Sequence, residues 1–458
     1  MALQLSELPN ELLVAIFRAC VSADSEWASK GTTSQTLPII IRVCHLWRSL
    51  ALDTSELWSD MSVDLCDAQS YARAKTYVSR SRDHTLAVHV NCVPESDEIP
   101  HLEFIAGLAP RITWLIVRGR AMSTVEQILA TMEGAPLLRR LEYSVYQNDH
   151  PRQHEFWGLS EHPVVRLPML RHLKAIRGCE QCAPRLAGLV SLNITHLPPL
   201  ALANIIRDCP SLEALALPLY DPIVAASDAE TPSLVEAPST KRFAVDATDN
   251  LARGPCVPIS LPNLEYLELS DDRGYSSEGY SQLFPPPKGA PKSTNPFPKL
   301  QTLHLHNGYD FERSLCMPFL RSLSTVRHLI LTNPDTLPVS EKHWPGLQSM
   351  HVNTVLYTGE PRTGLFLTSE DLKAFAEARP AVEIIVPDHE TVPVDLPFRR
   401  VPHGEYGLIS SDDVAEEDDG FYSDEMEGMF EIDHDFESEW DDYEDEDEED
   451  DDDVYNDL

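Results

Sequence analysis

The chain has 458 residues, enough for two or three domains or one long repeat array, and its formal net charge is −38. Residues 410–458 hold 27 Asp or Glu and no Lys or Arg, whereas the other 409 residues carry a net charge of −11. This balance disfavours nucleic acid and anionic membranes as partners. No uncharged apolar run of about 18 residues, the length that spans a membrane, is present.

Nine scattered cysteines and an N-terminus without a signal-peptide pattern predict a reducing compartment, the cytoplasm, the nucleus or both.

Residues 1–63 are expected to form two short helices. Pro9 suits a first helical turn, and the apolar residues that follow it at helical spacing are Leu12, Leu13, Ile16, Phe17 and Cys20. A polar stretch, Ser22 to Gln35, is expected to end this pattern before a second helix begins near Pro38. One face of that helix would carry Ile40, Val43, Trp47 and Leu50. Such short helices must either pack on the rest of the chain or present an apolar face to a partner.

Residues 64–404 repeat the pattern apolar-x-x-apolar-x-apolar. Its middle positions are Leu115, Leu141, Leu173, Leu192, Leu215, Phe243 (a degenerate copy), Leu267, Leu303, Leu329 and Met350. Seven of the nine gaps are 19 to 28 residues, near the period of leucine-rich repeats. We therefore predict an α/β solenoid with a parallel sheet on its concave side and helices on its convex side. Inserted loops are expected near 221–258 and 271–299.

Three helices and a closing strand support this array. Ser123-x-x-Glu126 reads as a capping box before a helix, and Thr368-x-x-Asp371 opens a last one. Ile205, Ile206 and Cys209 predict a third helix that ends before Pro210, and the closing strand carries Val382, Ile384 and Val386.

Side chains that alternate with the leucines should point away from the core onto the concave face. We take as substrate-binding candidates Trp114, Arg118, Arg140, Lys174, Tyr266, His304, His306 and His351. Trp114, Tyr266 and the three histidines are expected to be exposed, and Glu142 is expected to pair with Lys174 across neighbouring strands. The alternative is that these residues only form the solvated face of a sheet.

Signals for catalysis, a metal or a cofactor are weak. Cys179-x-x-Cys182 is the one metal-like spacing, with His172, His196 and Cys209 nearby in the sequence, and no second such pair follows. We expect buried cysteines, no metal site, no cofactor and no enzyme activity.

Residues 405–458 are expected to be disordered because their like charges repel one another without apolar compensation. The segment from Asp441 to Asp453 would either attract a basic partner or keep the protein soluble.

The first 60 residues resemble an F-box, in the F-box-like form abundant in fungi. The matching residues are Leu8-Pro9-Asn10-Glu11-Leu12-Leu13, Ile16-Phe17, Val43-Cys44, Trp47-Arg48 and Leu57-Trp58. The polar loop between the blocks at Phe17 and Val43 is about ten residues longer than in the compact form of that family.

The resemblance implies a substrate receptor of an SCF-type ubiquitin ligase, which docks on a Skp-type adaptor and, through it, a cullin. The repeats would hold an unknown protein substrate. The implied adaptor-binding residues are Leu8, Pro9, Leu12, Leu13, Ile16, Phe17, Val43, Trp47, Leu50 and Trp58, although Trp47 and Trp58 could instead brace the helices. The alternative is a repeat-based interaction scaffold that works without a ligase.

Overall fold

The computed structural model describes residues 8–28, 36–92, 99–120, 122–132, 135–145, 167–175, 188–194, 199–217, 234–246, 257–270, 277–286, 295–306, 317–332, 337–338, 344–353, 369–387 and 399–401. The chain divides into two units, residues 1–410 and residues 411–458. The acidic segment 405–458, expected to be disordered, lies outside the described residues. Among the helices of the described ranges, none is both long and apolar enough to cross a membrane.

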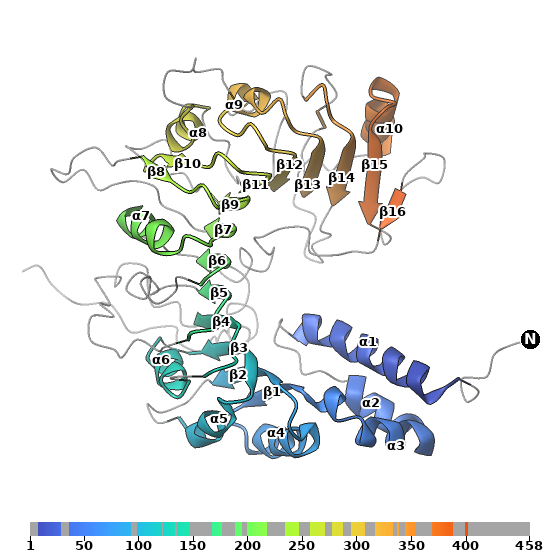
Figure 1. The fold of residues 1–458 in the computed structure, drawn as a ribbon. Coiled ribbons are helices and arrows are strands. Elements are labelled where there is room, and N and C mark those ends of the chain that lie inside the picture. Colours follow the sequence, from blue (N-terminus) through green and yellow to red (C-terminus); the bar gives the residue numbers. More distant parts are fainter. Residues whose placement is uncertain are drawn as a thin grey trace, which may run out of the picture. The chain divides into compact units, whose positions relative to one another are not determined.

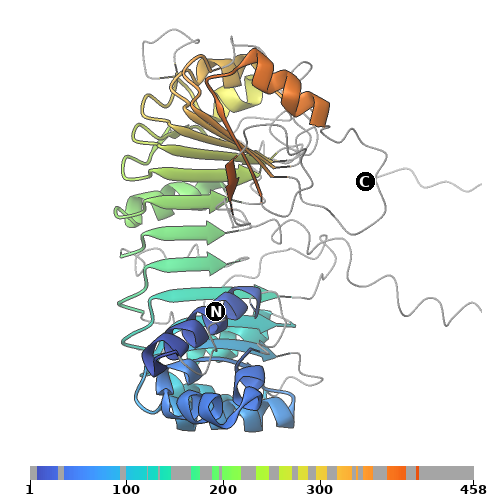
Figure 2. The ribbon, with the colours of Figure 1, turned by 90° about the vertical axis from the view of Figure 1, so that its right-hand side faces the viewer.

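The first unit is built on one parallel sheet, to which the described residues contribute fourteen strands (Figure 1). Its strands, in spatial order, are β1 (Asp60–Asp64), β2 (Leu86–Cys92), β3 (Ile112–Gly119), β4 (Arg140–Val145), β5 (His172–Ala175), β6 (Ser191–Ile194), β7 (Ala214–Leu217), β9 (Arg242–Asp246), β11 (Tyr266–Ser270), β12 (Thr302–His306), β13 (His328–Thr332), β14 (Ser349–Asn353), β15 (Glu383–Pro387) and β16 (Arg399–Val401). Figure 2 shows consecutive strands stacked like rungs with a common direction. The strands β8 (Val235–Glu236) and β10 (Ile259–Ser260) form a separate parallel pair.

The middle apolar residues of the repeat pattern face one another along the whole sheet. Leu115 is in register with Leu141, and the same column continues through Leu303, Leu329 and Met350. These side chains are buried in one continuous apolar core. One unit alone could not remove its leucines from water, but stacking buries them against both neighbours. The fold is therefore the predicted leucine-rich-repeat solenoid.

The array begins earlier than the predicted boundary at residue 64. Met61 of β1 and Val88 of β2 precede Leu115 at a constant spacing of 27 residues, and the three are in register. Both added side chains are almost completely buried. The first two strands of the sheet were thus missed, although their spacing matches the period of the array.

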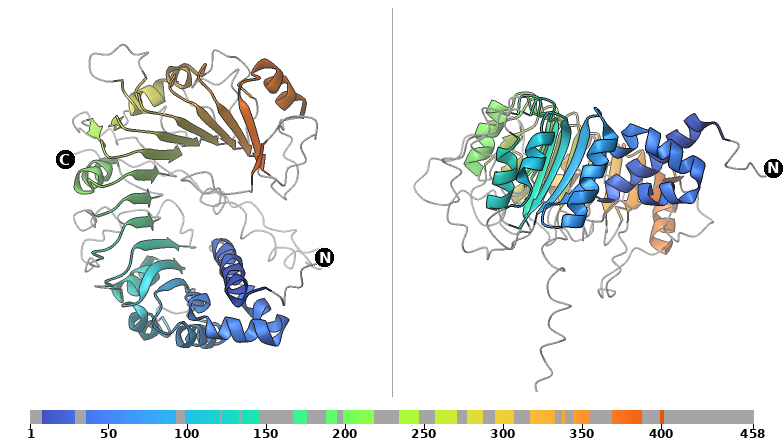
Figure 3. Two further views of the ribbon diagram at one scale, coloured as in Figure 1. Left: turned by 45° about the vertical axis from the view of Figure 1, so that its right-hand side comes forward. Right: turned by 90° about the horizontal axis from the view of Figure 1, so that it is seen from below.

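Helices lie on the outer side of the curved sheet (Figure 3). They are α4 (Ala68–Ser81), α5 (Leu102–Leu108), α6 (Met122–Ala130), α7 (Pro199–Asp208), α8 (Ser277–Leu283), α9 (Met317–Ser322) and α10 (Ser369–Ala378). The predicted helices at Ser123, Ile205 and Asp371 correspond to α6, α7 and α10. Of the two ranges expected to hold inserted loops, 271–299 contains the helix α8, and 221–258 contains β8 and also β9, which is the strand predicted as the degenerate copy at Phe243.

The N-terminal residues form α1 (Asn10–Ala28), α2 (Thr36–Val43), α3 (His45–Asp53) and the short 3-10 helix η2 (Ser55–Trp58). Two expectations were wrong here. The first helix continues into the polar stretch as far as Ala28, and the second helix is two helices separated at Cys44. Cys44 has an extended backbone, and its Sγ accepts a hydrogen bond from the Trp47 N–H, so it caps α3 and interrupts the helix.

Candidate functional site

The N-terminal helices have a small apolar core of their own. It consists of Leu13, Phe17, Leu37, Ile40, Ala51, Leu57 and Trp58, all buried. The ring of Phe17 lies 4.9 Å from that of Trp47, centroid to centroid. Leu13, Phe17 and Trp58 therefore support the helices from within, and they do not face outward as the adaptor contacts that the resemblance implied. For Trp58, this agrees with the alternative bracing role.

A second set of apolar side chains on the same helices faces outward. Leu12 and Ile16 of α1 are 52% and 43% exposed, and Ile39 and Val43 of α2 are 59% and 54% exposed. Leu46, at the start of α3, is also exposed. Leu12 with Ile16, and Ile39 with Val43, are each four residues apart and so share a helix face. We call these five residues the N-terminal apolar surface.

Most of the exposed large apolar side chains in the described ranges belong to the N-terminal apolar surface. The two others are Leu137 and Met169, each in a turn. Among the other residues implied as adaptor contacts, Pro9 is exposed, and Leu8, Trp47 and Leu50 are half-buried. Ile39 and Leu46 were missed, because the break at Cys44 gives α2 and α3 separate outward faces. The signal that could have found Ile39 is its spacing of four from Val43.

The helical unit is attached to the first repeat through Trp58. Its indole Nε1 donates to the Ala51 carbonyl at 2.8 Å. The ring packs edge-on against Tyr77 of α4 at 5.0 Å, and the Arg80 guanidinium lies over it at 4.5 Å. These contacts of Trp58 are on the buried side of the helices, so they do not cover the N-terminal apolar surface.

The inner face of the sheet has one aromatic and charged cluster at β2–β4. The guanidinium of Arg140 lies 4.3 Å over the ring of Trp114, and its Nε is 2.6 Å from Glu142 Oε1. On the other side, the ring of His89 is 5.6 Å from Trp114. His89 Nε2 and Trp114 Nε1 are buried and make no hydrogen bond within the described residues. The predicted candidates Trp114 and Arg140 are thus in contact, with Arg118 half-buried on the same strand as Trp114.

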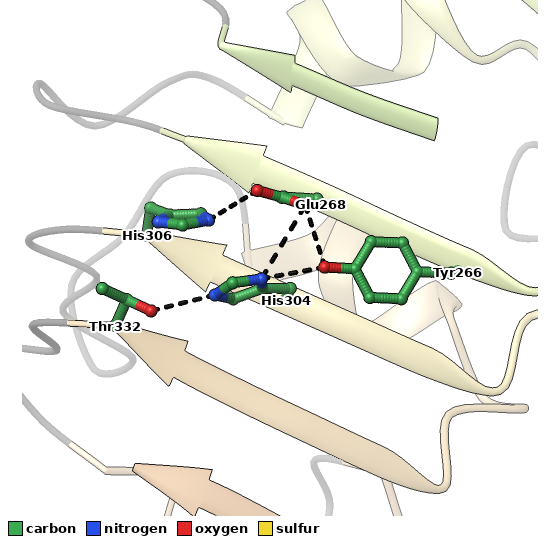
Figure 4. A network of polar contacts seen from close by, with 5 residues as sticks. All are labelled: Tyr266, Glu268, His304, His306 and Thr332. Atoms are coloured by element: carbon green, nitrogen blue, oxygen red, sulfur yellow. Dashed lines mark hydrogen bonds and ion pairs between the residues drawn. The ribbon is translucent and has the colours of Figure 1, made fainter. Parts of the chain in front are cut away.

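A second cluster lies on the inner face at β11–β13 (Figure 4). We call it the Glu268 network: Tyr266, Glu268, His304, His306 and Thr332. The Tyr266 hydroxyl donates to Glu268 Oε2 at 2.8 Å, and His306 Nε2 lies 2.7 Å from Glu268 Oε1. His304 Nδ1 is 2.9 Å from the Tyr266 hydroxyl oxygen, and its Nε2 is 2.9 Å from Thr332 Oγ1.

The proton positions in this network follow from counting donors. Tyr266 has one hydroxyl proton, which it gives to Glu268, so its oxygen accepts from His304 Nδ1–H. The other nitrogen of a neutral His304 then accepts from the Thr332 hydroxyl. Burial first, and then the neighbouring His306, lower the pKa of His304 to about 3, which keeps the ring neutral. Burial and Glu268 raise the pKa of Tyr266 well above its ordinary value.

The expectation that His304 and His306 are exposed was wrong. Glu268 is 0% exposed, His304 2% and His306 8%. Strands lie about 5 Å apart, so side chains of neighbouring strands cover one another, as Tyr266 of β11 and Thr332 of β13 cover His304. Along β12 itself, the rings of His304 and His306 are 3.9 Å apart. Tyr266, His351 and Lys174 are half-buried. Lys174 is in register with Glu142, and Glu142 forms an ion pair with Arg140 of its own strand.

The cysteine pair singled out by spacing, Cys179 and Cys182, lies outside the described residues, as does His196. Cys209 is buried at the end of α7, and burial raises the pKa of its thiol to about 11. A thiol of that pKa is a poor nucleophile at neutral pH.

Comparison with known proteins does not assign this chain to a family. No family model matches the sequence, and no curated protein is similar enough to match it. Among solved structures, the chain is similar to the leucine-rich repeat-containing protein LegL7 from Legionella pneumophila, with 12% identity and a TM-score of 0.33. That similarity covers 70% of this chain and 96% of LegL7.

Proposed function

We propose that this chain is the substrate-recognition subunit of an SCF-type ubiquitin ligase, acting in the cytoplasm, the nucleus or both. The observation that carries the proposal is the N-terminal apolar surface, presented by helices whose sequence resembles an F-box. Leu12, Ile16 and Val43 of that surface are among the residues that the resemblance assigns to the adaptor.

The physical support is the cost of leaving such a surface in water. Full burial of one large apolar side chain is favourable by about 1.5–3 kcal/mol of free energy. Five of them exposed on three adjoining helices are typical of a protein-binding surface. The separate core around Phe17 keeps the helices folded while this surface stays available.

In this proposal the solenoid holds the substrate, and the chain supplies no nucleophile. A receptor of this kind acts by raising the effective concentration of substrate lysines near the ubiquitin-charged enzyme. The cluster of Trp114 and Arg140 is our first candidate for the substrate contact, because Trp and Arg are enriched at the centres of protein interfaces. Arg140 has a 52% exposed side chain, so a partner can reach it.

The alternative function is a repeat-based scaffold that binds protein partners without a ligase. The same N-terminal apolar surface would then bind a partner other than a Skp-type adaptor. The two functions differ in whether adaptor and cullin accompany the chain.

The test is binding of the purified full chain to a purified Skp-type adaptor by calorimetry. The double variant Leu12→Asp with Ile16→Asp should weaken binding by more than about 100-fold, since it places two charges in an apolar interface. The matched control is Leu137→Asp with Met169→Asp, which changes the two exposed apolar side chains of the solenoid turns and should leave binding unchanged.

Circular dichroism should show that both double variants keep the fold of the wild type, because all four positions are exposed. Adaptor binding that survives the Leu12→Asp, Ile16→Asp change would contradict the docking assignment. If the wild type fails to bind any adaptor, the ligase role is wrong and the scaffold function takes its place.

A further inference from the structure

We propose that Glu268, His304 and His306 form a binding site for one divalent transition-metal ion of the Zn²⁺ class. One nitrogen of each imidazole and one carboxylate oxygen all lie within 4.8 Å of one another. Two histidines and one glutamate are a ligand set that binds Zn²⁺ with a coordination position left open. This inference is independent of the ligase role.

Strand register brings the three ligands together. Glu268 of β11 is directly opposite His304 of β12, and His306 lies two residues further along the same face of that strand. The sheet thus fixes two ligands on one strand and the third on its neighbour, a rigid arrangement that a loop would not provide.

The ligand distances suit an ion of this size. In a tetrahedral zinc site the ligand atoms are about 3.4 Å apart, given bonds of about 2.0–2.1 Å. Glu268 Oε1 lies 2.7 Å from His306 Nε2, and the other carboxylate oxygen, Oε2, lies 3.8 Å from His304 Nδ1. One ligand atom from each of the three residues lies within 4.8 Å of the others, close to the separation that an ion requires. Small side-chain rotations are enough to bring both nitrogens to the ion. The ion would also place positive charge beside a fully buried carboxylate, which favours its ionised form.

Neighbouring hydroxyl groups are placed to orient the ligands. With the ion on His304 Nδ1, the proton of that ring moves to Nε2, which then donates to Thr332 Oγ1. Tyr266 continues to donate to Glu268 Oε2 and leaves Oε1 for the ion. Metal-bound histidines almost always donate their second N–H in this way, and metal-bound carboxylates are likewise hydrogen-bonded. Both hydroxyl partners are therefore already in position.

Access to the site is from the side of His306. Its side chain is 11% exposed, whereas those of His304 and Glu268 are 2% and 0% exposed. His306 is also the last residue of β12. An ion held here would join β11 to β12 and keep its open coordination position toward that end of the inner face.

The test uses the full chain after dialysis against a chelator, titrated with Zn²⁺ in a calorimeter. The wild type should bind one ion per chain above the weak background that the acidic residues 410–458 contribute to every variant. His306→Ala should weaken Zn²⁺ binding by about 100-fold or more. That is beyond the roughly 10–100-fold expected for a residue that only hydrogen-bonds to a metal ligand. The matched control is His328→Ala, a half-buried imidazole on the next strand whose Nδ1 contacts Ser349, and it should bind as the wild type does.

A second measurement guards against misfolding. Zn²⁺ should raise the melting temperature of the wild type and of His328→Ala, but not that of His306→Ala or Glu268→Gln. If either His306→Ala or Glu268→Gln does not fold, the other of these two variants is used for the test. Equal binding by the wild type and a folded His306→Ala, or a wild type that shows the background alone, would overturn the site.

Discussion

The N-terminal helices and the inner face of the sheet at β11–β13 distribute polarity in opposite ways. On α1–α3, apolar side chains such as Leu12 and Ile39 are more than half exposed. On β11 and β12, the polar residues Glu268 and His304 are almost completely buried. The difference teaches that residue type alone does not set burial. A polar group can be buried when its hydrogen bonds are satisfied, and an apolar side chain can stay exposed on a helix whose opposite face supplies the core.

The largest effect should separate the two kinds of apolar residue on α1. Phe17→Ala, which empties the core of the helices, should lower the free energy of unfolding of that unit by about 3–5 kcal/mol. Leu12→Ala, five residues earlier and 52% exposed, should change it by no more than about 0.5 kcal/mol. Hydrogen exchange over residues 10–53, followed by mass spectrometry, measures both. Similar protection losses in the two variants would show that Leu12 is also part of the core.

A smaller effect should show that the buried polar face depends on its hydrogen bonds. Thr332→Val keeps the shape of the side chain but removes the hydroxyl that contacts His304 Nε2. Leaving that nitrogen buried and unpaired should cost about 1–3 kcal/mol in urea unfolding. Thr332→Ser retains the hydroxyl and should cost less than Thr332→Val. The reverse order would mean that packing, and not the hydrogen bond, stabilises this position.

The smallest effect concerns pH at the other end of the inner face. Burial is the main cause that lowers the pKa of His89 below 6.5, with Arg118 and Arg140 acting in the same direction and Asp60 and Glu142 in the opposite one. The unfolded chain therefore takes up a proton that the folded chain resists. Stability is complete above about pH 6.5 and falls as the pH drops below it, by at most about 1.4 kcal/mol per pH unit from this group. His89→Gln should reduce that slope in melting curves between pH 7 and 5; an unchanged slope would remove His89 as a cause.

The repeat strands could be predicted from the sequence because each one carries the same apolar spacing. Every predicted copy from Leu115 to Met350 became a strand of the sheet, including the degenerate copy at Phe243. The strands at Met61 and Val88 were missed, although their 27-residue spacing from one another and from Leu115 was readable.

The local details depended on contacts between residues far apart in the sequence. The helix break at Cys44 comes from a cap that a periodicity argument does not see. The burial of His304 depends on Tyr266, which is 38 residues away, and on Thr332, which is 28 residues away. A sequence pattern could have identified the cluster. Two histidines alternate in His304-x-His306, and the repeat spacing aligns Glu268 of the preceding strand with His304.

The most direct test of the central claim is to mix the purified full chain with a Skp-type adaptor and a cullin, then measure the mass of what elutes from a sizing column by light scattering. We predict a single species with one copy of each protein, and the loss of that species when Leu12 and Ile16 are both replaced by Asp. Elution of the wild-type chain by itself, beside an intact adaptor–cullin pair, would contradict the claim that the N-terminal apolar surface is a ligase docking site.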